Sequence, residues 1–150
     1  MLKTKKITLL LVALFFYGTA IYAQTGDKVS DNEVKQFVSA VKEVQVISQE
    51  SQQNMLKAVE ESGFTRQRFN QIYTGMQDPD TDVDADDEEM AKFNKVNTEI
   101  VSIQTEAQQK MEKEILKQDL TIERYQEINM KLQNDPELMQ KVQTLLQEEG

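Results

Sequence analysis

The sequence contains no cysteine and no histidine. The absence of cysteine excludes disulfide bonds, a thiol nucleophile and a lipid anchor attached through a cysteine, so packing alone must stabilise the fold. The two absences together remove the usual general bases, thiolate nucleophiles and soft-metal ligands. Carboxylate pairs such as Glu88-Glu89 and Glu148-Glu149 remain, but acid–base catalysis requires a pocket that separates their pKa values. We therefore expect a protein that is not an enzyme and that has no cofactor.

The first residues have the layout of a secretory signal peptide. Three lysines within the first six residues precede the apolar run Ile7 to Tyr17, and the small residue Ala23 follows. We expect cleavage after Ala23 and a periplasmic or secreted product. The alternative is an uncleaved membrane anchor, because Ile7 to Ala23 provides about 17 uncharged residues, the short limit for a spanning helix.

Basic residues are few, since 17 Lys and Arg stand against 26 Asp and Glu. Removal of residues 1–23, which contain three lysines and no acid, changes the formal net charge from −9 to −12. Phosphate backbones are bound through Lys and Arg, so we expect no nucleic-acid partner. Anionic membrane surfaces are disfavoured for the same reason, and we expect no stable membrane insertion after cleavage.

The chain repeats itself at an offset of 56 residues, which takes Phe37 to Phe93 without gaps. Such a duplication predicts two copies of one supersecondary unit. Shared apolar positions follow helical spacing and predict an amphipathic long helix and a short helix in each copy. The predicted repeat core consists of Phe37, Val44, Ile47, Met55, Val59, Phe69, Ile72, Phe93, Ile100, Ile103, Met111, Ile115, Tyr125 and Ile128.

The long helices have few apolar residues at their midpoints. Ser48 to Asn54 has none, and Gln104 to Lys110 has only Ala107. There the helix must pack thinly, approach a neighbour closely through Ser51 and Ala107, or stay hydrated.

Each long helix ends at a recognisable turn. Gly63 can adopt the left-handed conformation past a helix terminus, and Asp119, its counterpart, does so less readily. Thr65 and Thr121 then occupy the N-cap position of the short helices. The sequence predicts an all-α fold, a tandem repeat of helical hairpins (long helix, tight turn, short helix) plus a C-terminal helix, with bundle or coiled-coil-like packing.

The copies diverge after the short helix. Asp135-Pro136-Glu137 predicts the start of the C-terminal helix, whereas Asp78-Pro79 leads into an acidic stretch that we interpret as a solvated linker. The predicted organisation is a signal peptide (1–23), a flexible N-terminus (24–30), helical repeat 1 (31–77), an acidic linker (78–86) and helical repeat 2 with the C-terminal helix (87–150).

The acidic stretch also has the oxygen-ligand spacing of an EF-hand loop. Against a calcium site, Val83 stands where the sharp turn requires glycine, and Pro79 stiffens the second position. Alternating acids arise from composition alone, so weak cation attraction is the competing interpretation. The calcium candidates are Asp78, Asp80, Asp82, Asp84, Asp86 and Glu89.

Arg68 and Arg124 recur at the same position of the two copies. They mark either a shared anion or partner contact, or an ion pair with a glutamate of the adjoining long helix. We interpret Met55 and Met111 as core residues in preference to an adaptable binding surface.

The stretch Ala107 to Ile128, followed by Asn134 to Leu138, resembles a bacterial family known as domain of unknown function 4168, and Gln52 to Ile72 is similar to it. The resemblance covers Asp31 to Leu146. The sequence departs from the family pattern at Asp119, where glycine is expected, and the first copy lacks the helix that follows Asp-Pro in the second. The resemblance implies a bacterial, exported, helical protein and brings no reaction or catalytic residue with it.

These observations predict an exported, non-enzymatic protein that binds another envelope protein, itself or unfolded clients. Small exported helical chaperones are an analogy of size, class and compartment. The alternatives are a calcium-responsive module, and a carboxylate hydrolase, which would need an enclosed acidic cleft.

Overall fold

The structure, a computed structural model, describes residues 28–77 and 83–148. These residues form helices and no strand, so the predicted all-α class and the order of long helix, turn and short helix are confirmed. The predicted signal peptide lies outside the described residues. None of the helices in the two described stretches is both long and apolar enough to cross a membrane. The helices are α1 (Asp31–Glu61), α2 (Arg66–Gln77), α3 (Asp87–Lys117), α4 (Ile122–Lys131) and α5 (Pro136–Glu148).

The two long helices begin with equivalent caps. The Ser30 side chain accepts a hydrogen bond from the Glu33 amide, and the Glu33 carboxylate accepts one from the Ser30 amide, which completes a capping box. At α3, the Asp86 carboxylate accepts a hydrogen bond from the Glu89 amide at 2.8 Å. These side chains satisfy amides that have no partner inside the helix, which fixes where α1 and α3 start.

The turns after the long helices share one backbone conformation. Gly63 has φ +86° and Asp119 has φ +57°, so both residues occupy the left-handed region. The Thr65 hydroxyl then accepts a hydrogen bond from the Arg68 amide, and the Thr121 hydroxyl accepts one from the Arg124 amide, both at 3.1 Å. The second copy thus makes the same stop and restart as the first, although its turn has an aspartate.

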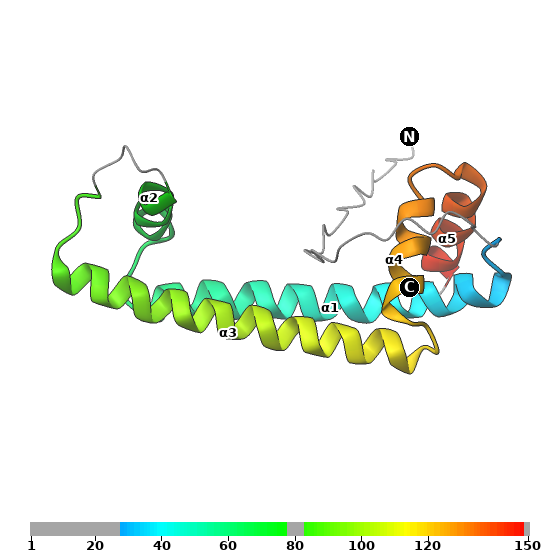
Figure 1. The fold of residues 1–150 in the computed structure, drawn as a ribbon, viewed down its shortest axis with the longest axis horizontal. Helices are drawn as coiled ribbons and strands as arrows, with labels where there is room; N and C mark the ends of the chain where they lie inside the picture. The colour runs from blue at the N-terminus through cyan, green and yellow to red at the C-terminus, as the bar shows by residue number, and fades with distance from the viewer. Residues whose placement is uncertain (1–27, 78–82, 149–150) are drawn as a thin grey trace, which may run out of the picture.

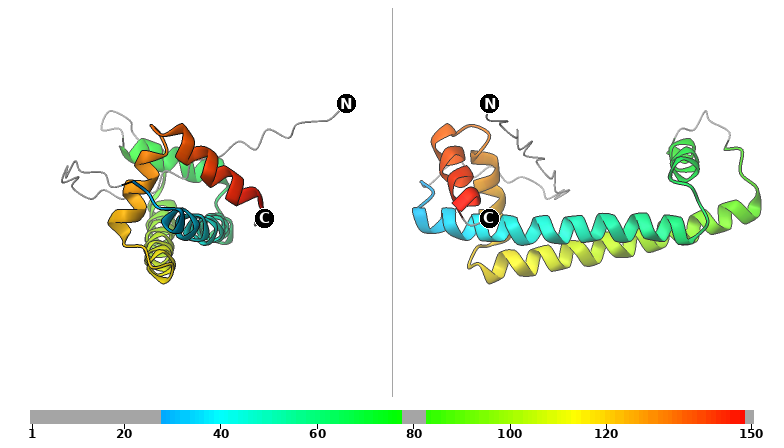
Figure 2. Two further views of the ribbon diagram at one scale, coloured as in Figure 1. Left: turned by 90° about the vertical axis from the view of Figure 1, so that its right-hand side faces the viewer. Right: turned by 180° about the vertical axis from the view of Figure 1, so that it is seen from behind.

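The long helices lie side by side and antiparallel, and they form a rod with a short helix at each end (Figure 1). Each long helix has 31 residues, which corresponds to about 46 Å. Figure 2 shows the same arrangement from two further directions. Near the middle of the rod Ser48, Ser51 and Ala107 are buried, so the helices approach closely there through small side chains.

Each short helix packs where the long helix of its own copy meets the long helix of the other. One cluster, the first core, joins the start of α1 to the end of α3, to α4 and to α5; the other, the second core, joins the end of α1 and α2 to the start of α3. Phe37 contacts Tyr125 in the first core and Phe69 contacts Phe93 in the second. Both pairs have ring centroids 4.9 Å apart and an interplanar angle of 31°. The two ends are therefore related by an approximate internal two-fold.

The two ends differ in what covers the rod. At the first core, α5 buries Leu138 and Val142 against the cluster that contains Val34 and Val38. At the second core, Val83 and Ala85 pack half-buried against the cluster. The described end of the acidic stretch thus contacts the fold through Val83 and Ala85.

Candidate functional site

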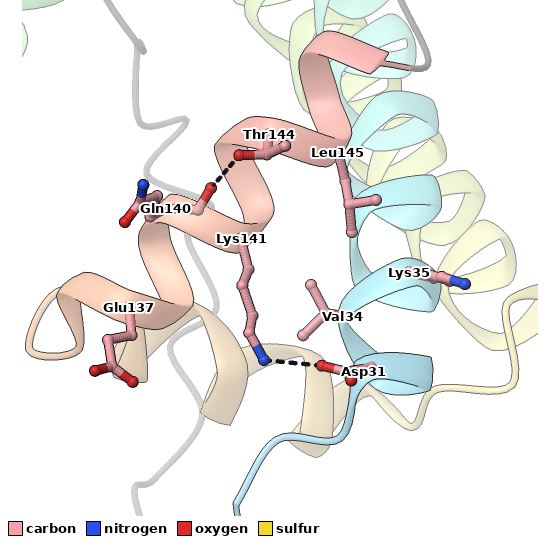
Figure 3. A pocket seen from close by; sticks show the side chains of 8 residues that line it. All are labelled: Asp31, Val34, Lys35, Glu137, Gln140, Lys141, Thr144 and Leu145. Atoms are coloured by element: carbon pink, nitrogen blue, oxygen red, sulfur yellow. Dashed lines mark hydrogen bonds and ion pairs between the residues drawn. The ribbon is translucent and has the colours of Figure 1, made fainter.

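The candidate site is a groove between α1 and α5, at the first-core end of the rod (Figure 3). α5 begins at Pro136, where the Asp135 carboxylate accepts a hydrogen bond from the Leu138 amide at 3.0 Å. Leu138 and Val142 then pack α5 against α1 in the first core. The groove has a volume of about 730 Å³. Its lining residues are Asp31, Val34, Lys35, Glu137, Gln140, Lys141, Thr144 and Leu145.

The groove has an apolar floor and a charged rim. Val34 and Leu145 lie between the helices, and the Lys141 ammonium reaches across to Asp31, with Nζ 2.9 Å from Oδ1 (Figure 3). This hydrogen bond lowers the pKa of Asp31 and raises the pKa of Lys141. Both groups are therefore ionised at neutral pH, and neither is suited to donate or accept a proton there. The arrangement suits binding through an apolar contact framed by charges of both signs.

The two repeated arginines hold the ends of the rod together. Arg68 forms a bidentate pair with Glu89, with Nε 2.7 Å from Oε1 and Nη2 2.6 Å from Oε2, and it also donates to the Asp84 carbonyl. Arg124 Nε lies 2.7 Å from Oε1 of Glu33. In both pairs the glutamate belongs to the long helix of the other copy, and the offset of 56 residues relates the two pairs to each other. The arginines thus join one copy to the other.

The Arg124 pair is the more enclosed of the two. The Arg124 and Glu33 side chains are 18% and 26% exposed, against 35% and 27% for Arg68 and Glu89. Hydrogen bonds from Arg124 and from the Ser30 amide lower the pKa of Glu33 to about 2. Hydrogen bonds to Glu33 and Glu127 raise the pKa of Arg124. At the other end, the hydrogen bond to Arg68 lowers the pKa of Glu89.

The calcium candidates divide into two groups. Asp78, Asp80 and Asp82 lie outside the described residues. Of the others, Asp86 caps α3 and Glu89 binds Arg68. Within residues 28–77 and 83–148, no group of three or more acidic side chains is arranged to hold a metal ion. A calcium site that includes the first three aspartates stays a prediction.

Most of the predicted core residues belong to the two clusters. The first core takes Phe37, Val44, Ile47, Met111, Ile115, Tyr125 and Ile128, and the second takes Val59, Phe69, Ile72 and Phe93. Met55, Ile100 and Ile103 are half-buried. In the described chain, every buried side-chain nitrogen or oxygen has a hydrogen-bond partner.

Sequence reasoning identified the arginines but not their partners, and it missed the groove. The offset that aligns Arg68 with Arg124 also aligns Glu33 with Glu89, each at the third position after an N-cap. That coincidence was the available signal for the ion pairs. No comparable signal marks Lys35 or Lys141 as groove residues, because α5 has no counterpart in the first copy.

The comparisons with known proteins agree with the duplicated architecture. The chain matches the family described as Domain of unknown function (DUF4168) twice, over residues 19–84 and over residues 80–142. No curated protein and no solved structure matches the chain. Because the two matches cover more than half of the chain and follow its two copies, the chain belongs to the DUF4168 family and contains two tandem copies of its domain.

Proposed function

We propose that the protein is exported and binds another protein in the cell envelope, without catalysing a reaction. The observation that carries this proposal is the groove between α1 and α5, where the apolar side chains of Val34 and Leu145 lie between charged groups. An apolar contact inside a polar rim is the usual anatomy of a protein-binding surface. The ionised pair of Asp31 and Lys141 favours binding over proton transfer.

The acidic balance of the chain favours a basic partner. The sequence carries a formal net charge of −9, and loss of residues 1–23 makes it −12. A field of this sign attracts positively charged proteins and speeds their encounter. The partner is therefore a basic protein segment that places an apolar side chain in the groove, and its association weakens as salt rises.

Export is tested on the full chain expressed in a bacterium. We expect the protein in the periplasmic or secreted fraction with the intact mass of a chain that starts at Gln24. The control is a variant with Lys3, Lys5 and Lys6 replaced by glutamate, which disrupts the basic start of the signal. A full-length mass in the cytoplasmic fraction would overturn the export proposal.

Binding at the groove is tested with a photo-cross-linking amino acid introduced at Lys35 or at Gln140, both exposed. The internal repeat supplies the matched control, because Ala91 is the counterpart of Lys35 at the end of the rod without α5. We expect an adduct of one defined mass from the two groove positions and none from Ala91. Equal labelling at Ala91, or no adduct at either groove position, would contradict the proposal.

A chaperone role is a version of this proposal in which the partner is an unfolded chain. It predicts that the mature protein suppresses the aggregation of a basic client at equimolar concentration, and that added salt weakens the effect. An unchanged aggregation curve would remove this version and leave the groove-binding experiment unaffected.

A further inference from the structure

At each end of the rod an arginine–glutamate pair joins the two copies. Arg68 of the first copy binds Glu89 of the second, and Arg124 of the second binds Glu33 of the first. Two aromatic pairs also join the copies, since Phe37 contacts Tyr125 and Phe69 contacts Phe93. Each copy therefore presents a surface that the other copy fills.

Nothing in these contacts requires the two copies to belong to one chain. A second molecule offers the same glutamates, arginines and rings in the same order. Exchange of copies between two molecules preserves both ion pairs and both aromatic pairs. Among the described contacts, the exchange affects chiefly those made by the residues just before α3. One of these is the hydrogen bond from Arg68 to the Asp84 carbonyl. Exchange of identical elements is a low-cost route to a dimer.

We propose that a second copy of this chain is a partner of each repeat, so that two molecules exchange repeats. In the dimer, α1 and α2 of one molecule pair with α3 and α4 of the other. The proposal is independent of export and of the groove. A short connection holds the two copies of one chain at an effective concentration of about millimolar, so the monomer predominates at micromolar protein.

Opposite charge reversals in two molecules test the exchange directly. The R68E chain and the E89R chain each place two like charges together at the α2 end when folded alone. In an exchanged heterodimer, the two altered residues face each other in one half and the two native residues face each other in the other half. Relief of two repulsions, at about tenfold each, lowers the dissociation constant from millimolar to about 10 µM.

The experiment refolds the two mature chains together at about 100 µM and measures mass by native mass spectrometry. We expect a 1:1 heterodimer as the main species, and monomers when either variant is refolded alone. The R68E/E89R chain restores the pair within one molecule and should stay monomeric. Monomers alone in the mixture, or homodimers as abundant as the heterodimer, would overturn the proposal.

A second variant pair protects the test against misfolding. The R124E chain and the E33R chain carry the equivalent charge reversals at the other end of the rod. Refolded together, they should also give a 1:1 heterodimer. If neither pair yields folded protein, the native chain decides the question after refolding at about 1 mM, where dimers should form a large fraction. A native sample that remains wholly monomeric there contradicts the exchange.

Discussion

The two ends of the rod are built from the same repeat but are covered differently, and the sequence reflects that difference. At the first-core end α5 covers α1, and Val38 is fully buried. At the second-core end the counterpart of Val38 is Asn94, which is exposed. Met76 is 52% exposed at this end, whereas its counterpart Leu132 packs against the first core. The same repeated position is thus more buried at the first-core end than at the second-core end.

The packing that the two ends share predicts that truncation of equivalent side chains lowers the free energy of unfolding by equal amounts. Phe37 and Phe93 are each 1% exposed and occupy equivalent places. We expect F37A and F93A each to lower the free energy of unfolding by about 3–5 kcal/mol, because each leaves a large cavity. Urea unfolding followed by circular dichroism measures both. Two separate transitions in either variant would break the comparison, since the ends would then unfold independently.

Val38 and Asn94 occupy the same repeated position, and replacing each residue by the other should lower the free energy of unfolding by unequal amounts. V38N buries an amide in the first core and should cost about 3 kcal/mol, because the amide loses its hydrogen bonds to water. N94V alters an exposed position and should change stability by at most about 0.5 kcal/mol. Equal costs for the two variants would show that α5 does not bury this face.

Acid should weaken the Arg124 end. The folded pKa of Glu33 is about 2, below the 4.5 of a free glutamate, so the contribution of this pair is complete above pH 4.5 and is lost as the pH falls toward 2. After allowance for partial exposure, we expect E33Q to cost about 1–2 kcal/mol at pH 7. The unfolding free energy of E33Q, measured from pH 7 to pH 2, should fall less steeply than that of the native chain. A parallel fall would mean that Glu33 is not paired in solution.

Substitutions in the two turns should have small effects of opposite sign. D119G should raise the free energy of unfolding by about 0.5–1 kcal/mol, because glycine adopts the left-handed conformation without strain. G63A should lower it by about 1 kcal/mol for the same reason. The alanine Cβ would meet no atom within 4 Å, so the backbone alone sets the cost. Thermal unfolding of the two variants checks the signs, and a stabilised G63A would contradict the assigned turn.

The local features of the fold were predictable from sequence because their causes lie within a few residues. The turns at Gly63 and Asp119, the threonine caps and the start of α5 at Asp135 each follow from one backbone conformation or one side-chain hydrogen bond. The repeat offset then related the turn and the threonine cap of one copy to those of the other. This is why the helix order could be predicted from one sequence.

The pairing of the copies and the groove were not predictable in the same way. Periodicity shows that Phe69 and Ile72 share an apolar face, but not that Phe93 of the other copy completes their cluster. The packing of α5 on α1 likewise depends on tertiary geometry, so Lys35 and Lys141 looked like ordinary exposed lysines. Two features of the sequence agree with the difference between the ends: only the second copy is followed by a C-terminal helix, and Asn94 stands at the position of Val38.

The central claim is that the two repeats pair antiparallel, with each short helix placed between the long helices at its own end. Because the chain has no cysteine, spin labels can be attached at two introduced cysteines, and pulsed electron resonance on dilute monomer measures their separation. Labels at Lys35 and Ala91 should lie on the order of 40 Å apart, at opposite ends of the rod. Labels at Lys35 and Lys117 should lie at less than half that separation. A short distance for the first pair, or a long one for the second, would contradict the account.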